Sequence, residues 1–485
     1  MEKFFRNGMI GLACAVLLAF AALHPPTAFA KTGARPEQPR NVIVLIVDAC
    51  SSEQYTLARW FKGEPLSFDE AMAGAVKTYI ADSVVADSAP AASAFATDCR
   101  TNDKFISVGP AGPVITGVDH PAPDLQYKPL ATVLESARLL NKATGIVATS
   151  PVTHATPAAY AAHVHSRNME EVIMEQTVYQ NVDVAFGGGR QYLLGQEAGG
   201  KRPDGENLLE VLKGRGYSIV ETREDMMALK SVRAFGLFAA SHLEPEIDRL
   251  QNAPQQPSLQ EMTAKAIELL SRDPDGFFLF VEGSQVDWAC HANDPAHLLS
   301  DLLAYDKAVK EALDFAKKDG NTVVLALSDH NTGGMSLGNY AADDTYSQMK
   351  PEQLLAPLKG MKASAHAVWK KLGDERSPGK LKDLVREFWG IEISDEEAAF
   401  IIRLSGKYKD DAYYALGEVI SARHTFVGWT THGHAGGDVP LFTFGPDRPT
   451  GLLDGPGIGR ATAFALGVDL DALNRRLFVD ASKAF

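Results

Sequence analysis

Short apolar runs rich in β-branched residues alternate along this chain with longer amphipathic segments. Residues 42–47 and 277–281 are almost continuously apolar, which is typical of strands buried on both faces of a sheet. This pattern predicts strands at residues 41–48, 76–81, 144–149, 182–186, 235–240, 276–282, 322–328 and 439–444.

Helical periodicity lies between these runs, with the clearest segments at residues 130–141, 258–271 and 295–318. Ser258 and Glu261 form a capping-box pattern at the start of the second segment. Strands that alternate with helices in this way indicate an α/β fold with a large, mainly parallel central sheet and helices on both faces.

Residues 349–422 depart from this alternation, because they are helix-rich and charged and contain no convincing strand. Ser394 and Glu397 form another capping-box pattern, and the sequence Ser-Pro-Gly at residues 377–379 indicates a break. We interpret this stretch as a helical insertion near the site, a lid or crown, within a single catalytic domain of residues 31–485.

The first thirty residues have the pattern of a secretory signal peptide. Lys3 and Arg6 precede an apolar run at residues 9–23, and Ala-Phe-Ala at residues 28–30 matches a cleavage site. The apolar run is too short for a comfortable membrane span, so we expect no span in the mature protein. Cleavage after Ala30 and a periplasmic or secreted location are therefore predicted.

Composition and charge narrow the function further. The chain is 45% hydrophobic and 22% charged, which is ordinary for a globular protein. The net charge of −14 and the absence of a basic block argue against nucleic-acid binding. An acidic protein also repels phosphate esters, so a phosphate site needs local positive charge from metals, arginine or helix ends. After cleavage the chain keeps three cysteines, Cys50, Cys99 and Cys290. We favour three unpaired thiols, although one disulfide between two of them is an alternative.

Candidate metal ligands stand at the ends of four predicted strands. Asp48, Glu282 and the pair Asp329-His330 end three of them, and Asp87-Ser88 follows a fourth after a short connection. A single carboxylate at a strand end is usually a helix cap, but four at equivalent ends are hard to explain in that way. Ligands bind at the carboxyl ends of parallel strands, and carboxylates with imidazoles suit zinc and magnesium.

Two further segments add histidines. Asp287 and His291 are four residues apart, so one helical turn places both side chains on the same face. Alone, they would be an ordinary helix-terminal Asp and a surface His, but the nearby Glu282 favours metal binding. Downstream, His432 and His434 occupy a Gly-rich loop that precedes a predicted strand, which also favours metal ligation.

Ser88 stands at the start of a predicted helix of small residues. By default such a serine is an N-cap. The same geometry presents a hydroxyl and free N–H groups to an anion, and a neighbouring divalent cation would lower the hydroxyl pKa enough for direct attack.

Taken together, these segments resemble the alkaline phosphatase family. The matching stretches follow the family's order and spacing from about residue 40 to 445, and they are residues 41–48, 87–89, 154–159, 282–291, 328–330 and 433–434. The chain departs from the family at Ala49-Cys50, where glycines are common, and at Pro90 and Ser93. A proline is tolerated in the first turn of a helix.

The resemblance implies an enzyme that hydrolyses small-molecule phosphate monoesters, with Ser88 as the nucleophile that becomes phosphoserine and Arg167 as the phosphate clamp. It also implies two zinc ions and a third ion of the magnesium type. The implied ligands are Asp287, His291 and His434 for the first zinc; Asp48, Asp329 and His330 for the second; and Asp48, Thr156 and Glu282 for the third ion. Residues implied around these sites are Asp87, His154, Trp288 and His432. With His154 present, the third ion would be more water-bound or a transition metal.

A homodimer is the family expectation. Two alternative functions stay open at the level of sequence. One is a phosphodiesterase or sulfatase of the same broad fold, although the sulfatase pattern Cys-x-Pro-x-Arg is absent around Ser88. The other is a pseudoenzyme that binds phosphate or metal. A pseudoenzyme should lack a metal ligand or the nucleophile, whereas this chain has a suitable residue at every position that could be mapped.

Overall fold

The computed structural model describes residues 40–112, 115 and 123–480. The predicted signal peptide and its cleavage site lie outside these residues. Within the described parts of the chain, none of the helices combines the length and apolar character needed to cross a membrane.

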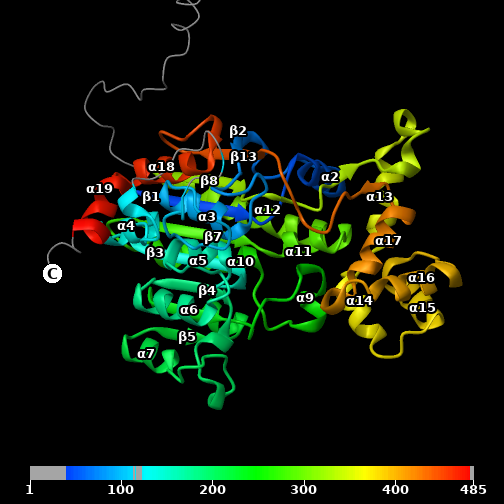
Figure 1. Ribbon diagram of the computed structural model, residues 1–485, viewed down its shortest axis with the longest axis horizontal. Helices are drawn as coiled ribbons and strands as arrows, with labels where there is room; N and C mark the ends of the chain where they lie inside the picture. The colour runs from blue at the N-terminus through cyan, green and yellow to red at the C-terminus, as the bar shows by residue number, and fades with distance from the viewer. Residues whose placement is uncertain (1–39, 113–114, 116–122, 481–485) are drawn as a thin grey trace, which may run out of the picture. The chain divides into compact units, whose positions relative to one another are not determined.

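A ten-stranded mixed sheet organises the fold, in the order β14-β2-β13-β8-β1-β7-β3-β4-β6-β5 (Figure 1). All neighbouring strands are parallel except β13, which is antiparallel to β2 and β8. This confirms the predicted α/β class. The strands are β1 (Asn41–Val47), β2 (Met72–Lys77), β3 (Ala143–Pro151), β4 (Val184–Gly188), β5 (Ser218–Val220), β6 (Ala234–Leu237), β7 (Phe277–Gly283), β8 (Thr322–Ser328), β13 (Val439–Phe444) and β14 (Gly451–Asp454).

The apolar pattern located buried strands better than exposed ones. The predictions for β8 and β13 match at both ends. The prediction for β2 was wrong by four residues at each end, because the residues of β2 are mostly half-exposed while buried residues follow in the loop. The edge strands β5 and β14 were missed because they are short and lack a continuous apolar run.

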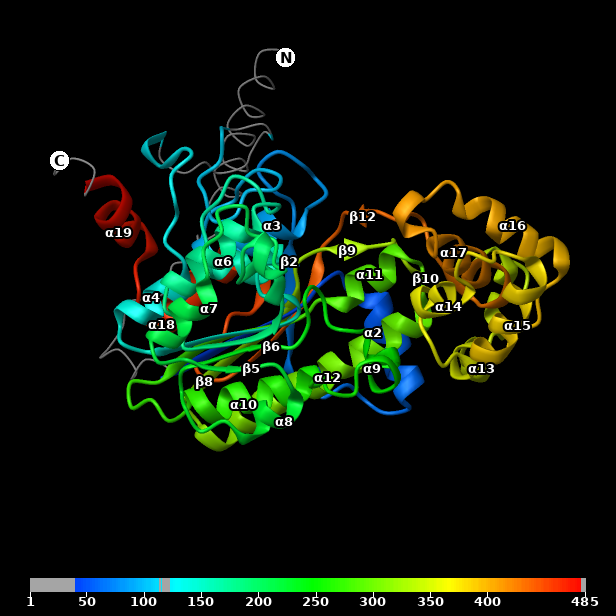
Figure 2. The same ribbon diagram turned by 90° about the horizontal axis from the view of Figure 1, so that it is seen from below.

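Helices cover both faces of the sheet, so alternate residues of β1 pack against helices on opposite faces. Ile43, Leu45 and Val47 pack in a core with α10 and α12, whereas Val42, Val44 and Ile46 pack with α3, α4 and α18 on the opposite face (Figure 2). The helices outside residues 349–422 are α2 (Ser52–Lys62), α3 (Ser88–Thr97), α4 (Val133–Leu139), α5 (Ala155–Ala161), α6 (Glu170–Tyr179), α7 (Leu208–Gly214), α8 (Arg223–Ala228), α9 (Glu246–Asn252), α10 (Leu259–Leu270), α11 (Gln285–His291), α12 (Pro295–Asp319), α18 (Gly455–Leu466) and α19 (Leu470–Asn474).

The helix starts follow from local sequence. The predicted capping box of Ser258 and Glu261 opens α10, and a second one opens α4 at Thr132. The prediction of a helix from residue 130 therefore began too early, because Thr132 is the N-cap.

The stretch of residues 349–422 contains four complete α-helices and most of a fifth, which runs on to His424, and the five lie together on one side of Figure 2. Two carboxylates outside this stretch bind the start of its second helix. Asp248 accepts a hydrogen bond from the backbone N–H of Ser364 (3.2 Å), and Asp294 accepts one from the backbone N–H of Ala365 (2.6 Å). The five helices are α13 (Pro351–Gly360), α14 (Ala365–Leu372), α15 (Pro378–Trp389), α16 (Asp395–Ser405) and α17 (Tyr414–His424).

The cysteines that the structure describes, Cys50, Cys99 and Cys290, are free thiols, as the favoured prediction had it.

Candidate metal centre and active site

Three neighbouring central strands bring carboxylates to one edge of the sheet. β1 lies between β7 and β8, and its last residue, Val47, pairs with Gly283 and Ser328. Asp48, Glu282 and Asp329 therefore meet at the carboxyl edge, where all three are fully buried. Buried carboxylates without compensation are costly, so this edge calls for cations.

Asp48, Asp329 and His330 form the first set of candidate ligands. One ligand atom from each lies within 4.8 Å of the others. Nε2 of His330 is 3.5 Å from Oδ1 of Asp48 and 3.3 Å from Oδ2 of Asp329. Among the residues that the structure describes, neither Asp48 oxygen has a hydrogen-bond partner, and the same holds for Asp329 Oδ2. The chemistry of this donor set fits a divalent ion, and binding of an ion by these three residues stays a prediction.

Asp287, His330 and His434 form a second set, also within 4.8 Å. His291 adjoins it, with Nε2 at 3.2 Å from Oδ2 of Asp287, while Nε2 of His434 is 3.9 Å from Oδ1 of the same carboxylate. Nδ1 of His434 donates to the carbonyl of Ala86 (2.7 Å), which leaves Nε2 as the ligand atom. His330 lies between the two sets, and its ring stacks on that of His434 at 3.9 Å.

Asp48, His154 and Glu282 form the third set. The family resemblance implied Thr156 as a ligand of this set and His154 as a neighbour of the ion. The structure adds His154 to the candidate ligands. Thr156 is fully buried, and within the described chain its hydroxyl has no hydrogen-bond partner. Glu282 is held through Oε2, which accepts hydrogen bonds from Ser150 (3.1 Å) and Ser284 (2.6 Å).

The pKa shifts of these side chains also favour bound cations. Burial, followed by the charge of neighbouring carboxylates, raises the pKa of Asp48 and that of Asp329 well above their usual range. Burial also raises the pKa of Glu282 to about 7. Burial and the charge of His434 lower the pKa of His330, so its imidazole is neutral, the form that binds metal. Divalent ions would stabilise the ionised carboxylates.

Asp287 and His291 form a charged pair. Burial acts against ionisation of both side chains, but the attraction between them is stronger. The charge of His291 lowers the pKa of Asp287, and the charge of Asp287 raises the pKa of His291 to about 9.

Ser88 is the first residue of α3, and Asp87 occupies the N-cap position. The default expectation that Ser88 caps the helix was therefore wrong. Its hydroxyl oxygen lies 3.0 Å from Nε2 of His330, and the residue is only 2% exposed. Pro90 lies in the first helical turn and does not interrupt α3.

The turn after β1 also forms despite its unusual sequence. Ala49 takes the left-handed conformation (φ 78°) that glycine would adopt freely, and its N–H donates to Oδ1 of Asp329 (3.3 Å). The N–H of Cys50 donates to the hydroxyl of Ser328 (2.7 Å). The turn thus holds Asp329 in place.

Arg167 reaches the site beside Ser88. Its guanidinium donates to Oδ1 of Asp87 at 2.5 Å and lies 3.0 Å from Nε2 of His154. Its backbone N–H donates to the carbonyl of Lys104 (2.9 Å), which fixes the start of the side chain. A planar guanidinium in this place can donate two hydrogen bonds to a phosphate.

The sequence did not indicate Thr332 or His242. Thr332 donates to Oδ1 of Asp287 (2.7 Å), and only its place two residues after His330 could have hinted at this. His242 packs edge-on against Trp288 (4.3 Å between centroids), whose ring is also 5.3 Å from that of His154. Trp288 thus lies beside His154 of the third set.

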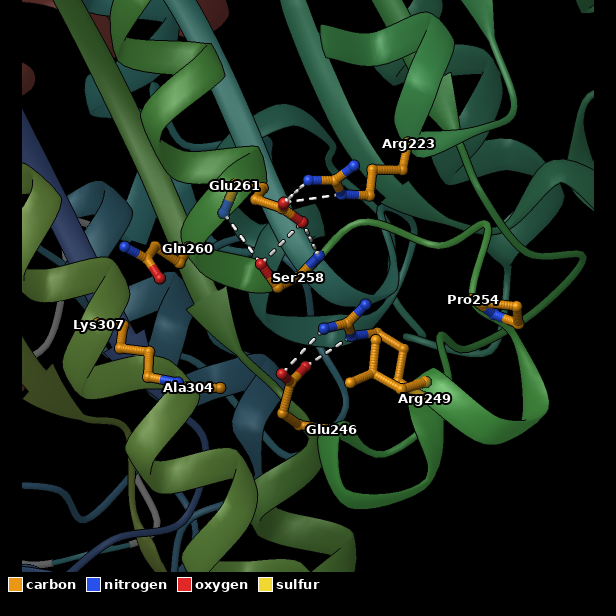
Figure 3. A pocket seen from close by; sticks show the side chains of 10 residues that line it. Arg223, Glu246, Arg249, Pro254, Ser258, Gln260, Glu261, Ala304 and Lys307 are labelled. Carbon is orange, nitrogen blue, oxygen red and sulfur yellow. Dashed lines mark hydrogen bonds and ion pairs between the residues drawn. The ribbon is translucent and has the colours of Figure 1, made fainter. Parts of the chain in front are cut away.

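A cavity of about 430 Å³ between α9, α10 and α12 offers a comparison (Figure 3). It contains two arginines, but Arg223 pairs with Glu261 (2.5 Å) and Arg249 pairs with Glu246 (2.7 Å). Each arginine is thus paired with a glutamate, which leaves Lys307 as the third cation of the lining, so the cavity lacks the clustered positive charge that a phosphate requires.

The α/β sheet, the buried sets of carboxylates and imidazoles, and a serine at a helix start define a metal-dependent hydrolase. Residues 39–466 match the family model described as alkaline phosphatase. The chain belongs to the alkaline phosphatase family. It is a phosphoric monoester hydrolase, and its substrates are phosphate monoesters.

Individual relatives agree with this assignment. Alkaline phosphatase 3 of Bacillus subtilis (strain 168) is 36% identical over 96% of this chain and 98% of its own length. The crystal structure of Thermus thermophilus alkaline phosphatase is 27% identical, with a TM-score of 0.77 over 92% of this chain and 96% of that one. A solved variant of alkaline phosphatase from the Antarctic bacterium TAB5, in which glutamate replaces a histidine, has Mg bound in its M3 site; it is 26% identical, with a TM-score of 0.62 over 89% and 99% of the two chains.

Proposed function

We propose that Ser88 is the nucleophile of phosphate monoester hydrolysis and passes through a phosphoserine intermediate. The observation that carries this proposal is the position of its hydroxyl, 3.0 Å from Nε2 of His330, at the start of α3. The first N–H groups of α3 have no partner within the helix, so they add positive potential where a phosphate would bind.

The proposed metal centre contains two zinc ions and a third ion of the magnesium type. Asp287, His291 and His434 would hold one zinc, and Asp48, Asp329 and His330 the other. Asp48, Thr156 and Glu282 would hold the third ion, with His154 within reach. When bound, the ions supply the positive charge that lowers the pKa of a serine hydroxyl and neutralises a bound phosphate.

The reaction then follows in two displacements. Arg167 donates two hydrogen bonds to two phosphate oxygens and orients the phosphorus toward Ser88. The Ser88 hydroxyl loses its proton to solvent, its oxygen bonds to phosphorus, and the bond from phosphorus to the alcohol oxygen breaks as that oxygen takes up a proton from solvent. Water then attacks the phosphoserine, the bond between phosphorus and the Ser88 oxygen breaks, and inorganic phosphate leaves.

The test compares the mature protein with Ser88→Ala on matched mono- and diesters, across pH and with or without a chelator. We expect monoesters to be hydrolysed faster than diesters, an alkaline optimum, and loss of activity with chelator or with Ser88→Ala. Turnover that resists chelation, full activity in Ser88→Ala, or an acid optimum would contradict the proposal. A faster diester reaction would favour the phosphodiesterase alternative.

We also propose that the protein works in the periplasm or outside the cell, after cleavage behind Ala30. The basic start, apolar run and cleavage pattern of residues 1–30 support this. Sequencing the N-terminus of the protein from its native host tests it, with Lys31 as the expected first residue; an uncleaved N-terminus would contradict it.

A further inference from the structure

His432 is enclosed by three side chains from the C-terminal part of the helix-rich stretch. Its Nε2 lies 3.1 Å from Oε2 of Glu418 and 3.1 Å from the hydroxyl of Tyr408. The ring of Tyr414 stacks on it, with centroids 5.2 Å apart and an angle of 10°. Tyr408 also donates to Glu418, so the tyrosine and the carboxylate hold the same edge of the imidazole.

Two of these contacts come from one face of α17. Tyr414 and Glu418 are four residues apart in that helix, so a single helical face presents both to His432. The position of α17 therefore determines the position of the His432 ring.

The opposite edge of His432 contacts the main chain of His291, which is a candidate metal ligand. Its Nδ1 lies 2.6 Å from the carbonyl oxygen of His291, and Nδ1 of His291 lies within hydrogen-bond distance of the carbonyl oxygen of His432. A carbonyl only accepts, so both Nδ1 atoms donate. For His291 this leaves Nε2 directed at Asp287, 3.2 Å away.

From this geometry we infer that Glu418 and His432 are positioning residues, which transmit the packing of α17 to the imidazole of His291. The inference rests on the proposed role of His291 as a zinc ligand. The group that accepts from the second nitrogen of His291 is the main-chain carbonyl of His432, so Glu418 and the His432 ring act on His291 indirectly, by fixing the main chain of these two histidines. Outer partners that orient a metal-binding histidine typically change metal affinity 10- to 100-fold when they are lost.

The loop of His432 has a second anchor, which should let variants fold. The N–H groups of Thr430 and Thr431 donate to the carbonyl of Gly333 (2.9 and 3.2 Å), and the N–H of Gly333 donates to the carbonyl of Gly433 (2.9 Å). Loss of Glu418 would thus loosen the His432 ring, and with it the hydrogen bond from Nδ1 of His432 to the carbonyl of His291, while the loop itself stays folded.

The experiment measures zinc binding by the full mature protein, stripped of metal and titrated with zinc against a competing chelator. The variants are Glu418→Ala, Glu418→Gln, which keeps the side-chain volume, and His432→Ala. Glu397→Ala is the matched control, because Glu397 makes an equivalent contact with His424 (3.2 Å) between α16 and α17, away from the candidate ligands. His291→Ala identifies the binding step to which His291 contributes.

We expect Glu418→Ala and His432→Ala to weaken the zinc-binding step that His291→Ala removes by about 10- to 100-fold. Glu418→Gln should weaken the same step by roughly threefold or more. Glu397→Ala should bind zinc like the unmodified protein. If His291→Ala loses the step but the Glu418 and His432 variants do not change it, the inference is wrong and the proposed ligand set stands. If Glu397→Ala weakens the step equally, general loosening of the helices explains the effect and the inference is wrong. If His291→Ala keeps every step, the proposed ligand set itself fails, and with it the inference.

Discussion

The hydroxyl oxygen of Ser88 lies 3.0 Å from Nε2 of His330, although 242 residues separate them in the chain. The contact exists because α3 begins at the carboxyl edge of the sheet, where β8 ends just before Asp329 and His330. It places a nucleophile beside an imidazole that lies within 4.8 Å of ligand atoms in two candidate sets.

Arg167→Lys should weaken phosphate binding. Lysine keeps the charge but loses the planar pair of donors, so we expect a loss of about 2 kcal/mol, or roughly 30-fold weaker inhibition by inorganic phosphate. Asp87→Asn, which keeps the shape of the partner of Arg167, should have a smaller effect. The inhibition constant of inorganic phosphate measures both effects. An unchanged constant in Arg167→Lys would show that Arg167 does not bind phosphate.

Asp48→Ala should be the most damaging change of a single carboxylate ligand, because Asp48 belongs to two candidate sets, whereas Glu282, Asp287 and Asp329 belong to one each. We expect the purified variant to lose two ions per chain, whereas Glu282→Ala should lose one. Elemental analysis after gel filtration gives the counts. Equal losses in the two variants would contradict a bridging role for Asp48.

His154→Asp should increase the affinity of the third set for magnesium by about tenfold or more, because hard cations prefer carboxylate oxygen to imidazole nitrogen. Magnesium titration, with His154→Asn as the uncharged control, checks this. Equal magnesium binding in both variants would show that His154 is not near the ion.

Asp294 gives the stability of the protein a defined pH dependence. Burial raises the pKa of this carboxyl from 3.8 to about 6, although it accepts hydrogen bonds from Ala365, His297 and Ala296. An acid with a raised folded-state pKa favours folding most at low pH, and this contribution is lost as pH rises from about 4 through 6. The shift corresponds to about 3 kcal/mol.

Asp294→Asn should remove this dependence. The free energy of unfolding, measured by urea denaturation, should fall in the unmodified protein relative to the variant between pH 4 and about 6.5. Parallel curves for the two proteins would contradict the buried, proton-holding state of Asp294.

Much of this fold could be predicted from the sequence where burial is continuous. The apolar runs of β1, β7 and β8 located the central strands, and the polar residues after them located the carboxyl edge of the sheet. β5 and β14 were missed because edge strands do not need to be apolar throughout. The helical spacing of Asp287 and His291 correctly placed both side chains on one face of α11, where Nε2 of His291 lies 3.2 Å from Oδ2 of Asp287, and their role as metal ligands stays a prediction.

The remainder of the site depends on contacts that no local pattern records. Asp87 and Ser88 are both acceptable helix caps, and only the structure shows that Asp87 takes the N-cap position and leaves the Ser88 hydroxyl beside His330. Arg167 was identified through the resemblance alone. The contact of Glu418 with His432 forms only once α17 packs beside the loop.

Mapping the phosphorylated residue during turnover tests the central claim most directly. Protein mixed with a phosphate monoester is quenched rapidly in acid, digested and analysed by mass spectrometry. Ser93→Ala is the matched control, because Ser93 lies in the same helix with its hydroxyl bonded to the carbonyl of Ala89 (2.7 Å). We predict phosphate on Ser88 in the unmodified protein and in Ser93→Ala, and none in Ser88→Ala. Steady turnover by the unmodified protein with no phosphate on Ser88, or with phosphate on another residue, would contradict the account.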